Sequence, residues 1–409
     1  MSSTAGKQPT WFERHPRLTI IAVILAGTVF LDVLAAQTNK VLLGYSWADR
    51  NPQHSKAAVE TQTRVQRGFR VPSELYDHDL AKNAAVENVI WGSTRYRVYT
   101  NSLGFRDRAT REIALRSDKH RLVIMGDSFT EGVGVNFEET FAGIVEQELG
   151  KAGVEVLNAG VVSYSPIIYW KKAENLLENV GFKFDEMAVF LDISDPQDEA
   201  RFYDLNDQGK VKRYKDVPDQ LARGISGTPP PPPVKQSGST KYASTIIRNN
   251  TILMYSLFRG ARELFTLRKE VKKEYGTNFT RALWTVEDAV YKDYGADGVE
   301  RMRLYMNKLV ELLRKHEVQL TVAVYPWPDQ IIREDLNSKQ VQIWQEWCEA
   351  NHVRFINYFP AFVKKSSTTT EKEQVLDRYF LDGNSHWNER GHEVIAKGFL
   401  DAYLKESRN

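Results

Sequence analysis

A serine near the start of the folded part of the chain is a candidate nucleophile. Ser128 follows Gly126 and Asp127, directly after the short apolar run 121–125. A serine at the tight turn that ends a strand lies at the edge of a sheet. There its hydroxyl can attack a carbonyl group and its backbone N–H can face a developing oxyanion. An ordinary turn capped by the serine or the aspartate would have the same tripeptide, so this stretch alone leaves both interpretations open.

A histidine near the end of the chain is a candidate general base. Asp382 and His386 lie four residues apart on a predicted loop just before the last helix. The carboxylate can hold one imidazole nitrogen while the other nitrogen takes a proton from a serine. A helix capped by Asn388 beside an incidental histidine is the alternative. His392 follows, but no third ligand is spaced with the two histidines, so we expect no metal site.

A glycine after the second apolar run is a candidate oxyanion donor. Gly160 ends the sequence Asn158-Ala159-Gly160, which follows the run 154–157. Because it has no Cβ, it lets a substrate approach the backbone closely and offers its own N–H. A plain turn glycine between a strand and a helix is the alternative.

Short apolar runs alternate with helical patterns along the chain. The predicted strands are 121–125, 154–157, 187–191, 318–324 and 353–356, and the predicted helices are 141–149, 167–180, 299–315, 341–350 and 392–404. Continuous apolar strands separated by helices are typical of a parallel sheet that is covered on both faces. We therefore predict an α/β fold with a doubly wound parallel sheet, in which sites form at the carboxyl ends of the strands.

The segment 18–36 is the candidate membrane span. It has 19 residues and a single charge, Asp32, and a helix needs about 20 mostly apolar residues to cross a bilayer. This length favours a retained anchor over a signal peptide, whose apolar region has about 7–15 residues, although 33–35 would serve as a weak cleavage site. A buried soluble helix is the remaining alternative.

The charges before the span predict its orientation. Lys7, Arg14 and Arg17 precede it, so residues 1–17 should form a cytoplasmic tail and the chain after about residue 37 should lie on the far side. In a bacterium this corresponds to a single-pass protein of the inner membrane with an extracytoplasmic, periplasmic domain.

The remaining regions suggest how the domain is organised. The polar, irregular stretch 37–94 is predicted to be a stalk and lead-in, and residues 95–406 the main domain. An insertion at about 200–298 interrupts the alternation of strands and helices and contains the five consecutive prolines 229–233, which favour a stiff, extended rod. Such an insertion could form one wall or lid of the site.

Composition excludes several classes of protein. Lys plus Arg total 55 and Asp plus Glu total 53, so the net charge of +2 gives no electrostatic footprint for nucleic acid. Cys348 is the only cysteine, so no intrachain disulfide can form. Nothing in the sequence indicates a nucleotide, a metal or an organic cofactor.

Taken together, the three stretches resemble the SGNH, or GDSL-type, hydrolase superfamily. That family has a Gly-Asp-Ser block near the start of its domain, then a glycine block, an Asn-bearing block and an Asp…His block near the end. The resemblance covers about residues 95–406 without the insertion, and the lead-in 99–107 resembles that of membrane-anchored members. It implies a three-layer sandwich with Ser128 as nucleophile, His386 as base and then acid, and Asp382 orienting His386. It also implies an oxyanion hole formed by the backbone N–H groups of Ser128 and Gly160.

Two features depart from the family pattern. The family's usual Asp-to-His spacing is three, whereas Asp382 and His386 are four apart; Asp377, or a Ser–His dyad supported by backbone, is the alternative. The family's Asn-bearing block should follow the run 187–191, but 191–199 contains no asparagine. Ser194 could donate in its place, whereas Asp192 and Asp195 would repel an oxyanion unless protonated or turned away. Loss of one oxyanion donor costs about 10²–10³ in rate, so we expect a slow enzyme or a third donor from elsewhere.

The leading functional prediction is a membrane-anchored serine ester hydrolase that acts through an acyl-enzyme on an O-acyl ester of the cell envelope, either an acylated small molecule or a glycan. The first alternative is an O-acyltransferase, for instance in O-acetylation of an envelope polysaccharide, with a multi-span membrane acyltransferase as its partner. Four tryptophans could then stack on sugar rings, although core packing is the commoner reason for such residues: Trp327, Trp344, Trp347 and Trp387. The second alternative is a non-catalytic glycan-binding or scaffold module.

Overall fold

The computed structural model describes residues 10–43, 68–91, 94–213, 251–253, 279–363 and 368–406. Contacts divide the chain into two units, one of residues 1–61 with 230–273 and one of residues 62–229 with 274–409. The second unit contains every residue singled out above as catalytic, so its fold decides how a site could form.

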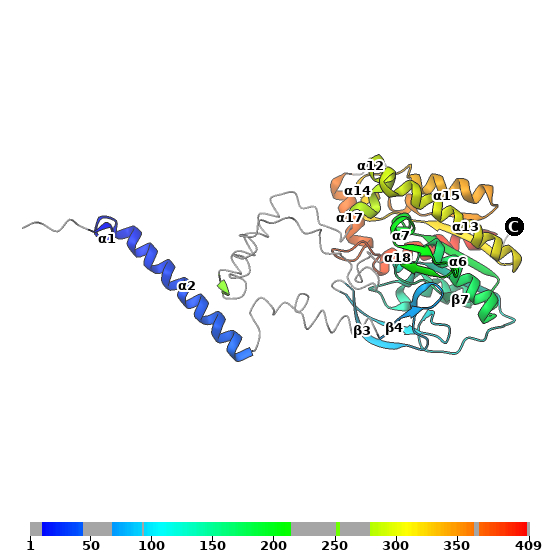
Figure 1. The fold of residues 1–409 in the computed structure, drawn as a ribbon, viewed down its shortest axis with the longest axis horizontal. Helices are drawn as coiled ribbons and strands as arrows, with labels where there is room; N and C mark the ends of the chain where they lie inside the picture. The colour runs from blue at the N-terminus through cyan, green and yellow to red at the C-terminus, as the bar shows by residue number, and fades with distance from the viewer. Residues whose placement is uncertain are drawn as a thin grey trace, which may run out of the picture. The chain divides into compact units, whose positions relative to one another are not determined.

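The first unit contains one long apolar helix. After the short α1 (Trp11–Arg14), helix α2 spans Pro16–Leu43, and its part Pro16–Thr38 is long and apolar enough to cross a membrane (Figure 1). A signal sequence near the N-terminus would meet the same criterion. The carboxylate of Asp32 in this helix is hydrogen-bonded: its Oδ1 accepts from the backbone N–H groups of Ile252 and Leu253 at 2.8 and 2.6 Å.

The second unit is built on an eight-stranded sheet. Its order is β12 (Arg354–Asn357), β11 (Gln319–Val324), β8 (Glu186–Leu191), β6 (Arg121–Gly126), β7 (Glu155–Asn158), β5 (Arg106–Asp107), β4 (Thr94–Thr100) and β3 (Ala85–Trp91). The strands from β12 to β7 are parallel, whereas β5, β4 and β3 are antiparallel additions at one edge. In Figure 1, β3 and β4 accordingly lie at the side of the unit opposite to α15.

The parallel strands form where the sequence has uninterrupted apolar runs. Every residue of β6 and of β8 is buried, which is what a strand covered on both faces requires. All five predicted runs form these parallel strands, within one or two residues at each end. The predicted α/β fold with a largely parallel central sheet is therefore confirmed.

The helices cover both faces because the chain reverses direction in the sheet. It runs from β6 through α5 (Phe141–Gly150) to β7, and then back across β6 through α6 (Pro166–Glu174) to β8. Right-handed crossovers in opposite directions place α5 and α6 on opposite faces. The C-terminal α18 (Glu389–Glu406) packs on α5, and α13 (Ala296–Lys315) packs on α6. Helix α15 (Lys339–Ala350) connects β11 to β12.

This reversal creates a topological switch point at the carboxyl ends of β6, β7 and β8. Neighbouring loops leave toward opposite faces there, and such a switch point is where open α/β sheets bind their ligands. Ser128, Gly160 and Ser194 each follow one of these three strands.

Two hairpins accompany the main sheet. One consists of β1 (Arg70–Ser73) and β2 (Asp77–Leu80), and the other of β9 (Tyr203–Leu205) and β10 (Val211–Arg213). Strands β1 to β3 thus fall within the stretch 37–94 that the sequence suggested as a stalk and lead-in. Of the predicted insertion, 200–213, 251–253 and 279–298 are described, whereas the prolines 229–233 lie outside the described residues.

Short helices complete the unit. They are α4 (Ser128–Glu131), α7 (Asp195–Arg201), α11 (Phe279–Ala282), α12 (Asp288–Val290), α14 (Pro328–Ile332), α16 (Phe359–Phe362) and α17 (Thr369–Tyr379).

Candidate active site

Ser128 lies at a tight strand-to-helix turn. It is the first residue of α4, and Asp127 caps this helix by accepting the backbone N–H of Phe129 on Oδ1 at 2.9 Å. The turn needs glycine at its start, because a Cβ on Gly126 would lie 2.1 Å from Thr130 Oγ1. The backbone N–H of Ser128 belongs to the first turn of α4 and so has no acceptor within that helix.

The structure brings Ser128 and His386 into direct contact. Nε2 of His386 lies 2.7 Å from Oγ of Ser128, although the two residues are 258 positions apart. The exposed fraction is 7% for Ser128 and 8% for His386, so both residues are buried but keep a small solvent-accessible area. This is the geometry in which an imidazole can take the hydroxyl proton.

Aromatic rings surround the imidazole of His386. Phe129 stacks on it at a centroid distance of 4.5 Å, and Trp91 of β3 contacts it edge-on at 5.1 Å. Burial in this apolar pocket lowers the pKa of His386 to about 3, so the ring is neutral at physiological pH. A neutral ring can accept a proton, and the edge strand β3 supplies part of the wall that keeps it neutral.

The residue that contacts the other imidazole nitrogen is Asn384. Its Oδ1 lies 2.6 Å from Nδ1 of His386, and its side chain is buried. Asp382 is exposed, as is the alternative Asp377, whereas the two imidazole nitrogens face Asn384 and Ser128. The expectation that Asp382 orients His386 is therefore corrected. Gly383, between the two candidates, has φ +63, and this left-handed turn separates the exposed Asp382 from the buried Asn384.

The orientation of the Asn384 amide follows from a second hydrogen bond. The backbone N–H of His386 also lies against Oδ1 of Asn384, at 3.2 Å. An N–H can only donate, so the side-chain atom it meets is the amide oxygen. Because the same oxygen faces Nδ1, the proton of the neutral imidazole is on Nδ1 and Nε2 is free to accept. Asn384 thus selects the tautomer that can deprotonate Ser128, without adding a negative charge.

Gly160 packs tightly beneath α4. A Cβ at this position would lie 2.6 Å from Thr130 Cγ2 and 2.9 Å from the backbone nitrogen of Glu131. The N–H of Gly160 donates to Asn158 Oδ1 at 3.0 Å, and Asn158 Nδ2 donates in turn to the carbonyl of Thr130 at 2.8 Å. The glycine therefore lies where the resemblance implies, but an oxyanion would have to share its N–H with Asn158.

The hydrogen-bond donors of Ser194 are both used by a neighbouring carboxylate. Both its backbone N–H and its Oγ donate to Oδ1 of Asp192, at 2.7 and 2.6 Å. In this arrangement Ser194 is a partner of Asp192, and the expectation that it donates to an oxyanion is not met. The other oxygen of Asp192, Oδ2, accepts from Tyr325 Oη at 2.8 Å and from Trp327 Nε1 at 2.7 Å. Four donors thus hold the Asp192 carboxylate.

Asp127 is the buried acid closest to the candidate nucleophile. Its Oδ2 lies 3.2 Å from Ser128 Oγ, and its Oδ1 lies 3.3 Å from Tyr325 Oη. Burial, and next the charge of Asp192, raise the pKa of Asp127 well above its usual value. Burial also raises the pKa of Asp195, whose Oδ2 accepts from Tyr169 Oη at 3.2 Å.

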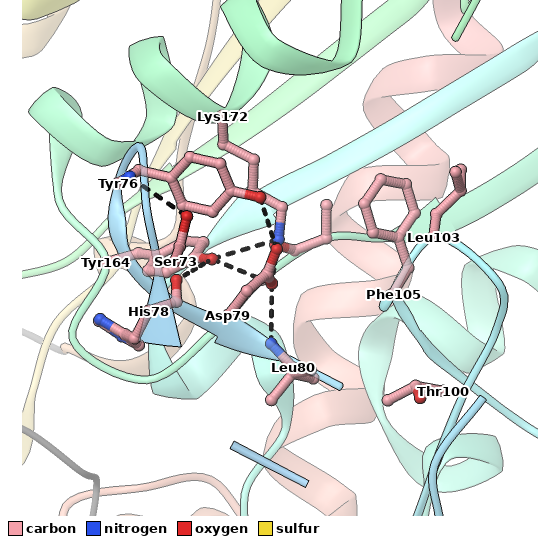
Figure 2. Close-up of polar contacts among 12 residues, drawn as sticks. Ser73, Tyr76, His78, Asp79, Leu80, Thr100, Leu103, Phe105, Tyr164 and Lys172 are labelled. Atoms are coloured by element: carbon pink, nitrogen blue, oxygen red, sulfur yellow. Dashed lines mark hydrogen bonds and ion pairs between the residues drawn. The ribbon is translucent and has the colours of Figure 1, made fainter. Parts of the chain in front are cut away.

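A buried ion pair supports the loop that carries Gly160. Lys172 of α6 is 1% exposed, and its Nζ lies 2.7 Å from Asp79 Oδ1 on β2 and 3.3 Å from the carbonyl of Ala159. Figure 2 shows this ammonium group reaching toward Asp79, with the hydroxyls of Tyr76 and Tyr164 directed to the same carboxylate. The Ala159 carbonyl and the Gly160 N–H belong to one peptide unit, so Lys172 fixes the orientation of that N–H.

The hairpin β1–β2 also holds the residues that flank this peptide. His78 Nε2 lies 2.7 Å from the carbonyl of Val162, and Arg70 pairs with Glu131 at the end of α4. Glu131 in turn accepts the backbone N–H of Val162 at 2.9 Å. The hairpin thus belongs to the support of the site.

The tryptophans suggested as sugar platforms are core residues. The structure buries all four, with exposed fractions of at most 7%: Trp327, Trp344, Trp347 and Trp387. Among the described residues, no group of three or more His, Cys, Asp or Glu side chains is arranged to hold a metal ion.

Asn384 and Tyr325 are the residues of the site that sequence reasoning missed. A polar side chain two residues before His386, next to a glycine able to adopt a left-handed turn, was the available signal for Asn384. Tyr325 directly follows the apolar run 318–324, at the same sheet edge as the other strand ends, and this position could have indicated its role.

No protein-family profile and no curated protein matches the chain. Among solved structures, a psychrotrophic esterase from Pseudoalteromonas sp. matches 71% of this chain and 100% of its own, with 11% identity and a TM-score of 0.37. A putative lipolytic protein of the G-D-S-L family from Desulfitobacterium hafniense DCB-2 matches 69% and 98%, with 11% identity and a TM-score of 0.34. A catalytic mutant of an acetylxylan esterase from Geobacillus stearothermophilus matches 71% and 96%, with 12% identity and a TM-score of 0.33.

Each of the three matches thus extends over about 70% of this chain. At such low identities and TM-scores these matches carry no argument, and the chemistry proposed next rests on the residues of this chain.

Proposed function

We propose that this protein is a membrane-anchored serine ester hydrolase of the SGNH type. The observation that carries the proposal is the contact of 2.7 Å between Ser128 Oγ and Nε2 of a neutral His386. The Asn384 oxygen supports it, because it holds the proton on Nδ1 and leaves Nε2 as the acceptor.

The proposed reaction has two halves. His386 takes the Ser128 proton as Oγ attacks the ester carbonyl, and then gives that proton to the leaving alcohol, so that an acyl-enzyme remains. Water, deprotonated by the same imidazole, attacks the acyl group; the acid leaves and Oγ regains its proton. The backbone N–H groups of Ser128 and Gly160 are the proposed oxyanion donors.

We further propose that the ester belongs to the cell envelope. An apolar N-terminal helix long enough to span a bilayer supports this location, and the basic residues before it support a cytoplasmic N-terminus. A retained anchor would hold the catalytic unit near the membrane and would restrict it to acylated molecules of that compartment.

A fluorophosphonate probe tests the nucleophile. The full-length protein in detergent should be labelled, because Ser128 Oγ would attack phosphorus and expel fluoride. The variant Ser128→Ala should not react, whereas Ser117→Ala, at an exposed surface serine, should react like the wild type. Equal labelling of Ser128→Ala would reject the proposal, and a wild type that is never labelled would favour a binding module.

Product analysis separates hydrolysis from transfer. With an O-acetylated glycan oligomer, a hydrolase releases free acetate. If an acylated acceptor glycan accumulates in place of the free acid, the protein is a transferase that uses the same residues. For the location, mass spectrometry of the membrane-extracted protein should find residues 18–36 still attached, and their absence would reject the anchor.

A further inference from the structure

We propose that Asp127 acts as a neutral carboxylic acid whose Oδ2–H donates a hydrogen bond to Ser128 Oγ, and that it is a catalytic residue of the hydrolase. This inference rests on the proposed function. It assigns to the aspartate of the Gly-Asp-Ser turn a role as hydrogen-bond donor in addition to capping α4.

Ser128 Oγ has more close polar contacts than its single hydroxyl hydrogen can supply. The hydroxyl has one hydrogen and two close neighbours, His386 Nε2 at 2.7 Å and Asp127 Oδ2 at 3.2 Å. Because Asn384 holds the imidazole proton on Nδ1, Nε2 must be an acceptor and takes the serine hydrogen. The contact with Oδ2 then has no hydrogen from the serine. It is a hydrogen bond only if the hydrogen comes from Asp127.

The two oxygens of Asp127 are not equivalent. Oδ1 accepts the backbone N–H of Phe129 at 2.9 Å, which suits a carbonyl oxygen. Tyr325 Oη is farther from this oxygen, at 3.3 Å, than from Asp192, at 2.8 Å, so its single hydrogen points to Asp192. Oδ2, the atom beside Ser128, is therefore the place for the acid hydrogen.

The surrounding charges favour this assignment. Asp127 is 3% exposed, and both it and Asp192 contact Tyr325, so two negative charges would share a dry pocket. Asp192 accepts four hydrogen bonds, whereas Asp127 accepts fewer, and burial together with the neighbouring Asp192 raises the pKa of Asp127 and so favours its neutral form. Other titratable groups around it within the described residues are His386, Tyr169, Asp195, whose pKa burial also raises, and Asp198, whose carboxylate is paired with Arg281.

A neutral Asp127 would offset the weakness of the base. His386 lacks a carboxylate partner and has a lowered pKa, so it removes the serine proton with difficulty. A donor on Oγ stabilises the negative charge that develops when the hydroxyl proton leaves, and again when Oγ departs from the acyl-enzyme. An ionised Asp127 would repel the same charge. Asp127 keeps its own proton throughout, so the reaction requires no further acceptor.

The rate of fluorophosphonate labelling as a function of pH provides the test. Wild-type labelling should decline at alkaline pH as Asp127 ionises. Asp127→Asn keeps both the cap, through Oδ1, and a donor, through Nδ2, and cannot ionise. It should lose the alkaline decline and label about tenfold or more faster than Asp127→Ala, which has no donor.

The outcomes are distinct. If Asp127→Asn is as slow as Asp127→Ala, or keeps the alkaline decline, the inference is overturned while the nucleophile stands. If labelling does not depend on Ser128 at all, the proposed function itself fails.

Infrared spectroscopy tests the protonation of Asp127 without any reaction at Ser128. The C=O stretch of the protonated Asp127 carboxyl group should appear as a band that shifts in Ser128→Ala as its acceptor is lost, and that is lost from the spectrum of Asp127→Asn, while a band from Asp195 would remain in all three. A wild-type spectrum equal to that of Asp127→Asn in this region would also overturn the inference.

Discussion

Asn384 Oδ1 lies 2.6 Å from Nδ1 of His386, in the place where a serine hydrolase normally has a carboxylate. An amide and a carboxylate oxygen orient the imidazole equally well. Only the carboxylate also stabilises the positive charge that the imidazole acquires when it takes the serine proton. The site therefore has the geometry of a triad with the basicity of a dyad.

Replacing the amide by a carboxylate should accelerate the reaction. In Asn384→Asp the tautomer is kept and a negative charge is added beside Nδ1, so fluorophosphonate labelling should become about 10- to 100-fold faster. Asp382→Asn is the matched control and should label at the wild-type rate, because Asp382 is exposed and Nδ1 of the imidazole faces Asn384. A loss of labelling in Asp382→Asn, with no effect of Asn384→Ala, would return the orienting role to Asp382.

The wild type should remain reactive in mild acid. A general base works in its neutral form, so the rate falls only as the pH drops through the pKa of His386, which burial lowers to about 3. Labelling at pH 5 should thus be close to that at pH 7, with circular dichroism confirming that the protein is folded. An acid limb centred near pH 6.5, the value for a solvated histidine, would show that the imidazole is better hydrated than the structure indicates.

Adding a methyl group at Gly160 should displace the backbone around Ser128 and Gly160. The new Cβ would meet Thr130 and the backbone of Glu131 at less than 3.0 Å, so α4 or the Gly160 peptide must move. We expect Gly160→Ala to lose about 1–3 kcal/mol of unfolding free energy and about 10²–10³ in labelling rate. Gly150→Ala is the control, since a Cβ there meets nothing within 4 Å. Equal labelling by both variants would remove Gly160 from the proposed oxyanion hole.

Removing the buried ammonium of Lys172 should destabilise the catalytic unit. Lys172→Met leaves Asp79 without its cation, and breaking one side of a buried pair costs about 3–5 kcal/mol. The double variant Lys172→Met/Asp79→Asn should recover part of this loss in urea unfolding. Lys151→Ala, which removes an exposed pair with Glu148, should change stability by less than about 1 kcal/mol. A Lys172→Met variant as stable as Lys151→Ala would contradict the pairing.

The sequence predicted the parallel core because buried strands leave a continuous apolar signal, as in 121–125 and 187–191. It also predicted that Ser128 and His386 meet, through the order of short motifs. It did not predict β3 as a sheet strand, because this edge strand exposes polar residues such as Glu87 and Asn88 and has no such run. Asn384 was missed because the spacing of residues on a loop does not reveal which side chain a left-handed glycine turns inward.

The large separation between Ser128 and His386 along the chain has a consequence for biosynthesis. The imidazole precedes the C-terminal helix α18, which packs on α5. A nascent polypeptide would emerge with its hydroxyl long before its imidazole, so the proposed chemistry could not begin during synthesis. Activity would then begin only once the last helix has packed on α5. Truncation within that helix would abolish activity even though Ser128 and strand β6 remain intact.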